Sequence, residues 1–453
     1  MKFKILLFSL FISIEIFGQH YTDFGQFNGT DSTSLPIGKL LTDGENRYII
    51  KIYSYIEKGE KLYYNDKLIY EFEENITTKK RIIVIKIDEH NNFLSLVAFD
   101  DYNKYIEKIK FIEGELYYLA YGSSGYYIKK YIGNGVSEVV FSYTKGDKVI
   151  VQDYQKRGNE LIVMGNFNAW QESMEILGDT LRHSNFSETG LGNTVFYYSI
   201  DLKNERVNYR FGYGGPVYET FITDVQIDSQ NNTVIYGLYQ SPETVVLGDT
   251  LGYVGGYQGT DAYIIRLDEK GNLISTNSFS SASVRDDIRN VHLSKDGSYY
   301  ASLYTDVYGE LLIDGKIYNE MNELRSMGYF VKFNEAGTLQ WIDRINIDGG
   351  GHEFKIMYET ERSIYAGGDF YIHDKLMEFN GETIQHETGN ITMSVILELD
   401  KETGELKRMS DIISNGKDIR IENSMQLGEI KSIVFKASQE NQIILNGDTI
   451  IPY

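Results

Sequence analysis

The chain alternates apolar and polar residues over short runs, and polar turns interrupt these runs at regular intervals. Residues 194–215 read TVFYYSIDLKNERVNYRFGYGG, and residues 261–281 read DAYIIRLDEKGNLISTNSFSS. Residues 328–350 and 394–412 have the same layout. Period-two alternation on both sides of an Asn, Asp or Gly turn is typical of a β-hairpin. The pattern therefore predicts an antiparallel strand pair over each segment.

These hairpins recur with one period. Their turns begin at Asp201, Asp268, Asn334 and Asp400, which are 67, 66 and 66 residues apart. A second landmark keeps the same period, with LGDT, IDGK, FNGE and LNGD beginning at Leu247, Ile313, Phe379 and Leu445. An earlier LGDT begins at Leu177. Two landmarks that share one spacing over half the chain indicate an internal repeat of about 66 residues.

A further strand pair lies between these landmarks, for example at residues 222–241, 288–305 and 352–370. Each period thus supplies a first hairpin (strands A and B), a decorated connection, and a second hairpin (strands C and D). Four-stranded antiparallel sheets at a fixed period predict an all-β protein of the β-propeller class. An open β-solenoid is the alternative, but its coils are usually much shorter.

The count of hairpins is uneven. Seven A–B pairs can be found, the last at residues 421–438, but only six C–D pairs. The polar segment His20–Pro36 is too short to supply another hairpin. The sequence thus predicts six full blades plus a partial seventh, unless the C-terminus is truncated. The expected domains are a signal peptide (1–19), a polar segment (20–37) and the repeat domain (38–453).

The N-terminus has the layout of a secretory signal peptide. Lys2 and Lys4 precede an apolar run from Ile5 to Phe17, and a polar stretch follows Gln19. The run is short for a membrane span. We therefore expect an exported chain, secreted or at the cell surface, with the periplasm as the alternative. No later segment is long and apolar enough to predict a span in the mature chain.

Composition narrows the function further. The formal net charge of −21 argues against nucleic acid as a partner, because phosphate binding requires an excess of Lys and Arg. The chain has no cysteine, which excludes disulfides, thiolate catalysis and Cys-ligated metals.

The repeat resembles a known family. The segments DAYIIRLDEKGN and GYFVKFNEAGTLQW are similar to repeats of secreted Bacteroidetes β-propeller proteins, the SBBP-like family. Its blades carry a D-A-F-V-x-K-L-D-x-N-G-N-x-x-W core, matched here by Asp261, Ala262, Leu267, Asp268, Gly271, Asn272, Lys332, Gly337 and Trp341. The resemblance implies export and a propeller fold, and it supplies no catalytic residues.

Loop lengths indicate where a ligand would bind. The A–B and C–D turns are tight, whereas the B–C and D–A connections are long and lie on the opposite face. Function concentrates on loops that a rigid scaffold positions. The irregular D–A loops contain the candidate binding residues, which are Arg285, Asp286, Asp287, Asp348, His352 and Glu353. A solvated, purely connecting loop is the alternative for each, and the LGDT-type decorations can simply extend the blades outward.

The sequence predicts no catalytic residue, metal site or cofactor. His352 and Glu353 are not followed by the spacing of a zinc motif, and His373 and His386 only flank a decoration. The Asp residues that open the turns are expected to cap them. We therefore expect a non-catalytic propeller that binds a protein or glycan, or a surface scaffold. The alternative is a polysaccharide-acting enzyme at the channel mouth. The sequence does not indicate the oligomeric state.

Overall fold

The computed structural model describes most of the chain, and its described residues contain strands and no helix. The described ranges are 8–13, 23–29, 39–42, 46–53, 57–64, 67–77, 79–88, 92–103, 105–144, 149–168, 173–182, 193–214, 220–240, 244–252, 259–281, 286–305, 311–319, 327–347, 353–372, 376–379, 382–385, 391–414, 419–427, 430–437, 443–445 and 448–451. Within them, no helix is long and apolar enough to cross a membrane.

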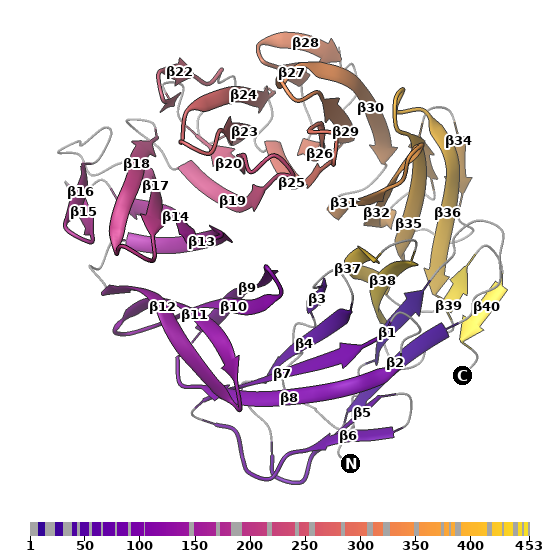
Figure 1. Cartoon of the computed structure of the whole chain (residues 1–453). Coiled ribbons are helices and arrows are strands. Elements are labelled where there is room, and N and C mark those ends of the chain that lie inside the picture. Colours follow the sequence, from indigo (N-terminus) through magenta and orange to yellow (C-terminus); the bar gives the residue numbers. More distant parts are fainter. Residues whose placement is uncertain are drawn as a thin grey trace.

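The strands form antiparallel sheets arranged around a central axis, which is the β-propeller architecture (Figure 1). Blade 1 contains β3 (Lys39–Thr42), β4 (Arg47–Tyr53), β7 (Lys80–Ile87) and β8 (Phe93–Asp101). Blade 2 contains β9 (Tyr105–Ile112), β10 (Glu115–Gly122), β11 (Gly125–Gly133) and β12 (Val136–Thr144). Blade 3 contains β13 (Val149–Arg157), β14 (Glu160–Asn168), β17 (Asn193–Asp201) and β18 (Arg206–Tyr213).

The next three blades match the clearest sequence repeats. Blade 4 contains β19 (Thr220–Ile227), β20 (Thr233–Tyr239), β23 (Asp261–Leu267) and β24 (Leu273–Ser280). Blade 5 contains β25 (Asp286–Leu293), β26 (Tyr299–Thr305), β29 (Met327–Phe333) and β30 (Leu339–Ile347). Blade 6 contains β31 (Glu353–Glu359), β32 (Ser363–Ile372), β35 (Ile391–Asp400) and β36 (Leu406–Ser414). The predicted four strands per period are confirmed.

The last sheet, blade 7, joins the two ends of the chain. The A–B pair β37 (Ile419–Leu427) and β38 (Ile430–Ala437) continues into β1 (Phe8–Ser13) and β2 (Asp23–Gly29). In the register, Leu10 of β1 lies opposite Phe435 of β38 and Gln26 of β2. This differs from the predicted partial blade, because β1 comes from residues that the sequence analysis assigned to the signal peptide. Cleavage of residues 1–19 stays a prediction.

The B–C connections carry small hairpins, which mostly extend the preceding blade. These pairs are β5–β6 (Lys61–Tyr64 and Lys67–Glu71) on blade 7, β27–β28 (Leu311–Ile313 and Lys316–Asn319) on blade 4, β33–β34 (Leu376–Phe379 and Glu382–Gln385) on blade 5, and β39–β40 (Ile443–Leu445 and Asp448–Ile451) on blade 6. Two others, β15–β16 (Ser173–Ile176 and Asp179–Arg182) and β21–β22 (Val245–Val246 and Asp249–Thr250), form separate two-stranded sheets. The LGDT-type decorations therefore extend blades in only part of the ring.

The turns that open at Asp201, Asp268, Asn334 and Asp400 occupy the same corner of successive blades. In each turn the side-chain oxygen accepts a hydrogen bond from the backbone N–H two residues later; for Asp268 and Lys270 this distance is 2.8 Å. The predicted capping role is confirmed.

The hydrophobic core lies between neighbouring sheets. One cluster joins blades 3 and 4 through fully buried Tyr197, Tyr213, Tyr239 and Tyr263. The C strand β23 is buried along its whole length, whereas the D strand β24 is only partly buried in its first half and buried in its second. Each sheet hides its apolar faces against its neighbours, so the ring is stabilised by contacts between successive repeats.

Candidate functional site

The predicted D–A loop residues are only partly described. Arg285, Asp348 and His352 lie outside the described residues, and Glu353 begins β31 with only its backbone described. Asp286 and Asp287 begin β25 and are both buried.

Both carboxylates have partners within the fold. An oxygen of Asp286 accepts a hydrogen bond from Ser281 Oγ at 2.7 Å, and its backbone N–H donates to the Thr260 carbonyl at 2.7 Å. Asp287 forms an ion pair with Arg289 at 3.1 Å, and Arg289 lies over the Tyr304 ring. These contacts fix the entry of an inner strand.

A β-bulge recurs in the inner strands. The extra residue is Gln152 in β13, Thr223 in β19, Arg289 in β25, Met357 in β31 and Glu422 in β37. A bulge turns the side chain that follows it out of the regular alternation. In β13, β19 and β25 the next residue is Asp153, Asp224 or Asn290, so polar side chains point between blades near the axis.

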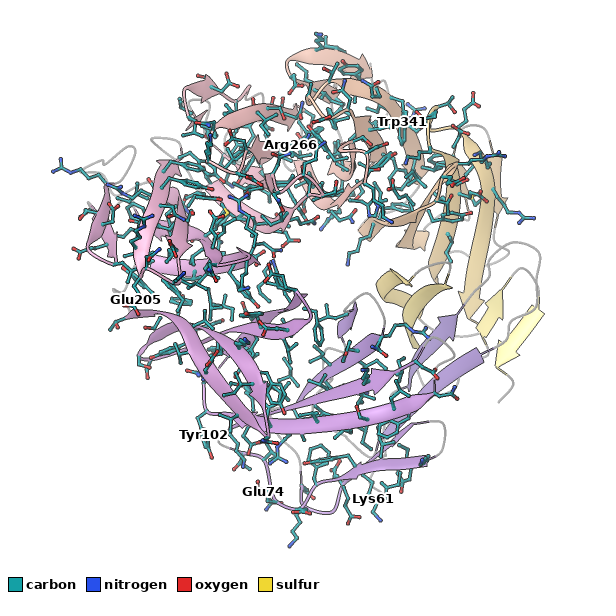
Figure 2. The ribbon with its side chains drawn as sticks, in the orientation of Figure 1. Lys61, Glu74, Tyr102, Glu205, Arg266 and Trp341 are labelled. Atoms are coloured by element: carbon teal, nitrogen blue, oxygen red, sulfur yellow. The ribbon has the colours of Figure 1, made fainter. Side chains whose placement is uncertain are left out.

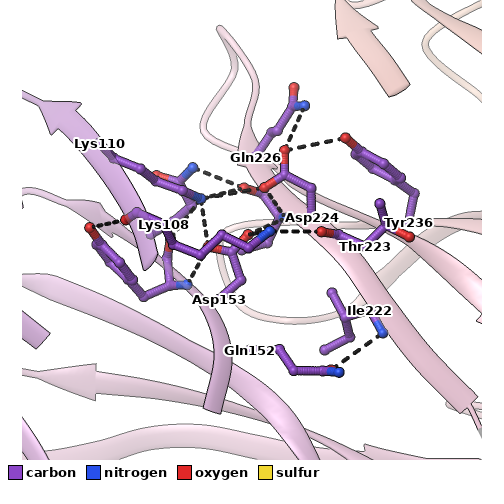
Figure 3. Close-up of polar contacts among 12 residues, drawn as sticks. Lys108, Lys110, Gln152, Asp153, Ile222, Thr223, Asp224, Gln226 and Tyr236 are labelled. Carbon is purple, nitrogen blue, oxygen red and sulfur yellow. Dashed lines mark hydrogen bonds and ion pairs between the residues drawn. The ribbon is translucent and has the colours of Figure 1, made fainter. Parts of the chain in front are cut away.

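Three blades meet at the charged cluster in Figure 3. Lys110 of β9 lies 2.8 Å from a carboxylate oxygen of Asp153 in β13 and 3.5 Å from one of Asp224 in β19. Lys108 of β9 reaches the other Asp153 oxygen at 3.6 Å. The Asp153 side chain is fully buried, while Asp224 and Lys108 are partly exposed.

Burial and charge shift the pKa values of this cluster in opposite directions. Burial raises the pKa of Asp153 to about 6, although the Lys110 ammonium opposes the rise. Burial alone would also raise the pKa of Asp224, but the charge of Lys110 and a hydrogen bond from Asp153 lower it instead. Below about pH 6 the two carboxyls therefore share one proton beside a charged Lys110, whereas both are mostly ionised at pH 7.

The cluster bonds mainly to backbone across blade boundaries. Asp153 accepts a hydrogen bond from the Val225 N–H at 3.1 Å, and Lys108 donates to the Thr223 carbonyl at 2.9 Å. Lys110 donates to the carbonyls of Tyr154 at 3.0 Å and Val225 at 3.3 Å. Such cross-blade bonds clamp blades 2, 3 and 4 together, because they satisfy polar groups of three inner strands at once.

Similar clamps join the tight-turn corners. Arg266, buried in blade 4 (Figure 2), donates to the Glu335 carbonyl in the C–D turn of blade 5 and pairs with Asp228. Lys332, one repeat later, donates to the Lys401 carbonyl of blade 6 at 3.0 Å. Neither clamp was predicted from the sequence, although the spacing of the two cations by one repeat was a usable signal.

A pocket of about 650 Å³ lies at the rim, between blade 2 and the hairpin β15–β16. Its lining comes from the end of β12, from β15–β16 and from the β17–β18 turn, and comprises Val140, Phe141, Ser142, Tyr143, Thr144, Ser173, Met174, Glu175, Ile176, Leu177, Thr180, Ile200, Leu202 and Glu205. Figure 2 shows Glu205 at this boundary. The walls mix apolar side chains with Ser, Thr, Tyr and Glu side chains, so the pocket can meet both apolar and polar groups of a ligand.

The hairpin β15–β16 is attached to its own blade. Arg210 of β18 donates to the Thr180 carbonyl at 2.9 Å and pairs with Asp179 at 2.6 Å. Tyr198 of β17 donates to the Asp179 carbonyl at 3.2 Å. These bonds hold the hairpin away from β12, and the pocket lies in the space between them.

The described residues hold no group of three or more His, Cys, Asp or Glu side chains that could bind a metal ion. No family model matches the chain, and no curated protein matches it. Solved structures of similar fold include the periplasmic gluconolactonase PpgL from Pseudomonas aeruginosa. It is 10% identical, the match covers 96% of this chain and 100% of that one, and the TM-score is 0.43. A member of the DUF4221 family from Bacteroides vulgatus is 9% identical over 91% and 98%, with a TM-score of 0.36.

Proposed function

We propose that this chain is an exported, non-catalytic β-propeller of the SBBP-like kind that binds a protein or glycan ligand. The observation that carries the proposal is the rim pocket beside β12, where two adjoining blades leave about 650 Å³ between walls of mixed apolar and polar side chains. The predicted signal peptide and the acidic composition support export.

The described charged groups near the axis favour binding over catalysis. Asp153, Lys110 and Asp224 combine a carboxyl of raised pKa with a lysine, as an acid–base site can. Their bonds run to the backbone of neighbouring inner strands, however, and Asp153 is fully buried. Holding blades 2, 3 and 4 together is therefore enough to account for the cluster.

A blocking variant tests the proposal. Thr180 is exposed and lines the pocket, so Thr180→Trp fills it. Thr250→Trp changes the equivalent residue of the hairpin β21–β22, which lies outside the lining. The mature protein is applied to a glycan array and used in pull-downs from the cell surface and culture medium. We expect Thr180→Trp to lose at least one ligand that wild type and Thr250→Trp retain. A ligand set unchanged by Thr180→Trp would refute binding at the rim.

Catalysis is tested on the same preparations. Release of reducing ends from a polysaccharide panel, abolished by a channel substitution and unaffected by Thr180→Trp, would replace the proposal with the enzyme alternative. We expect no release above the buffer control.

A further inference from the structure

The outer edges of the blades are covered unequally. In blade 4, Phe279 and Ser280 of β24 pair with Ile313 and Leu312 of the added hairpin. Blades 5, 6 and 7 carry antiparallel hairpins at the same edge. In blade 2, β12 is the last strand of its sheet within the described residues. Alternate N–H and C=O groups of such a strand are available to a further strand.

The hairpin that corresponds to this edge is β15–β16, which forms a separate two-stranded sheet and does not pair with β12. Ile176 precedes the β15–β16 turn as Ile313 precedes the β27–β28 turn. Phe279 and Ile313 are paired within one hydrophobic cluster, whereas Phe141 and Ile176 share a cluster without being paired. The rim pocket separates them. The position that a strand fills in blades 4 to 7 is therefore a pocket in blade 2.

The repeats show which chemistry fits this position. The edge strands β27 and β33 read LLI and LMEF, and they place Ile313 and Phe379 in the core against the D strand. A strand with apolar residues at alternate positions would meet the same kind of wall at Phe141 and Ile176.

The pocket is also acidic. Glu175 and Glu205 lie in its lining, which contains no Lys, Arg or His, and both side chains belong to exposed residues. The whole chain carries a net charge of −21. A basic segment would complement this lining and approach it faster than an acidic one.

Leu177, at the tip of the hairpin, lines the pocket. It has a φ of +52°, followed by Gly178 at +78°, and 53% of its surface is exposed. In the sequences of the hairpins that extend blades, the residue at the corresponding position, directly after the first strand, is Asp or Asn: Asp314, Asn380, Asn446 and Asn65. These residue types tolerate the left-handed region, whereas an exposed leucine does not favour it. Leu247 of β21–β22 has a similar φ of +49° and is also exposed, so the strain is common to both hairpins. What distinguishes Leu177 is its place in the pocket lining.

We propose that the open edge of β12 binds an extended, basic segment of another protein by strand addition, antiparallel to β12. The segment would pair with the outward backbone groups of β12 and place alternate apolar side chains over Phe141 and Ile176. Its basic residues would face Glu175 and Glu205. This inference rests on the proposed function, because it names the ligand class of the same pocket.

Labelled synthetic peptides test this directly. One peptide of about ten residues alternates Leu, Ile or Phe with Lys or Thr, and its partner replaces Lys with Glu. We expect the lysine peptide to bind the mature protein at least about tenfold more tightly, measured by fluorescence anisotropy. Two further peptides carry N-methyl groups on alternate residues, one set in each register. Strand addition predicts that only one register loses binding, because only alternate N–H groups reach β12.

Matched variants locate the site. Glu205→Lys is expected to weaken the lysine peptide about tenfold, whereas Glu269→Lys, in the C–D turn of blade 4, leaves it unchanged. Leu177→Asn is expected to weaken binding, and Leu247→Asn, the same turn substitution in β21–β22, is the control.

Several results would overturn the inference. Equal binding of both N-methyl registers, or equal effects of Glu205→Lys and Glu269→Lys, would exclude strand addition at β12. Concentration-dependent self-association that Glu205→Lys abolishes, with no peptide binding, would make a second copy the occupant. A glycan that Thr180→Trp displaces, with no peptide binding, would refute this inference and keep the proposed function.

Discussion

Removal of the Lys110 ammonium tests whether the axial cluster holds the blades together. Lys110→Met keeps the aliphatic length of the side chain, but it leaves the buried Asp153 and the partly exposed Asp224 without their closest cation. Removing one partner of a buried ion pair costs about 3–5 kcal/mol. Protonation sets an upper limit, since neutralising one carboxyl with an ordinary pKa of 3.8 at pH 7 costs about 4 kcal/mol. We therefore expect a loss of about 3–4 kcal/mol at pH 7.

The loss should depend on pH in a defined direction. Burial already raises the pKa of Asp153, and we expect removal of Lys110 to raise it further, because the ammonium opposes this rise. Such a carboxyl stabilises the fold at low pH, and this stabilisation is lost as the pH rises through the folded-state pKa. The same protonation costs only about 2 kcal/mol at pH 5. The destabilisation caused by Lys110→Met should therefore be about half as large at pH 5 as at pH 7.

Urea denaturation followed by circular dichroism measures both values. The matched control is Lys130→Met in the same blade, because Lys130 pairs with the partly exposed Glu115 at 2.6 Å. This variant should lose less than about 1 kcal/mol. Asp153→Asn added to Lys110→Met should recover part of the loss. A loss below about 1 kcal/mol for Lys110→Met, or an equal loss at both pH values, would contradict the clamp.

Three further outcomes are expected. Leu177→Asn should raise the free energy of unfolding by about 1 kcal/mol in calorimetry, as should Leu247→Asn, because asparagine tolerates the positive φ; unchanged values would refute strain at these turns. Gly237→Ala should destabilise by about 3 kcal/mol or more in urea, since the added Cβ would lie 1.9 Å from the Phe221 carbonyl oxygen; a smaller loss would mean that the bulge yields. Mass spectrometry of the exported protein should give an N-terminus at residue 20, whereas an intact N-terminus would keep β1 in blade 7.

The sequence was sufficient for the features that repeat. Asp268 and its equivalents open turns because an Asp or Asn side chain bonds its own backbone, and this local chemistry is visible in the residues. The strand order within each blade followed from the same alternation. Phe8–Ser13 was predicted to belong to a signal peptide, and in the structure it forms the strand β1. An apolar run suits both, and the pairing of this strand with β38 depends on residues more than 400 positions away.

The candidate site was less predictable. Asp153 and Asp224 are turned between blades by bulges, and the extra residues Gln152 and Thr223 blur the repeat spacing. The LGDT segment at Leu177 also has the same sequence as the one at Leu247. Whether such a hairpin docks on the preceding blade depends on long-range contacts, which for β15–β16 include Arg210. The sequence showed only that both of these turns contain a leucine, Leu177 or Leu247, where the hairpins that extend blades have Asp or Asn.

Hydrogen exchange at the blade edges tests the central claim most directly. Mass spectrometry of the free protein compares the second half of β12 with the second half of β24, which pairs with β27. We predict that β12 exchanges at least about tenfold faster than β24 and slows when the lysine peptide is added, because its outward N–H groups gain partners. Equal protection of β12 and β24 in the free protein would mean that this edge is already covered, and would contradict the account.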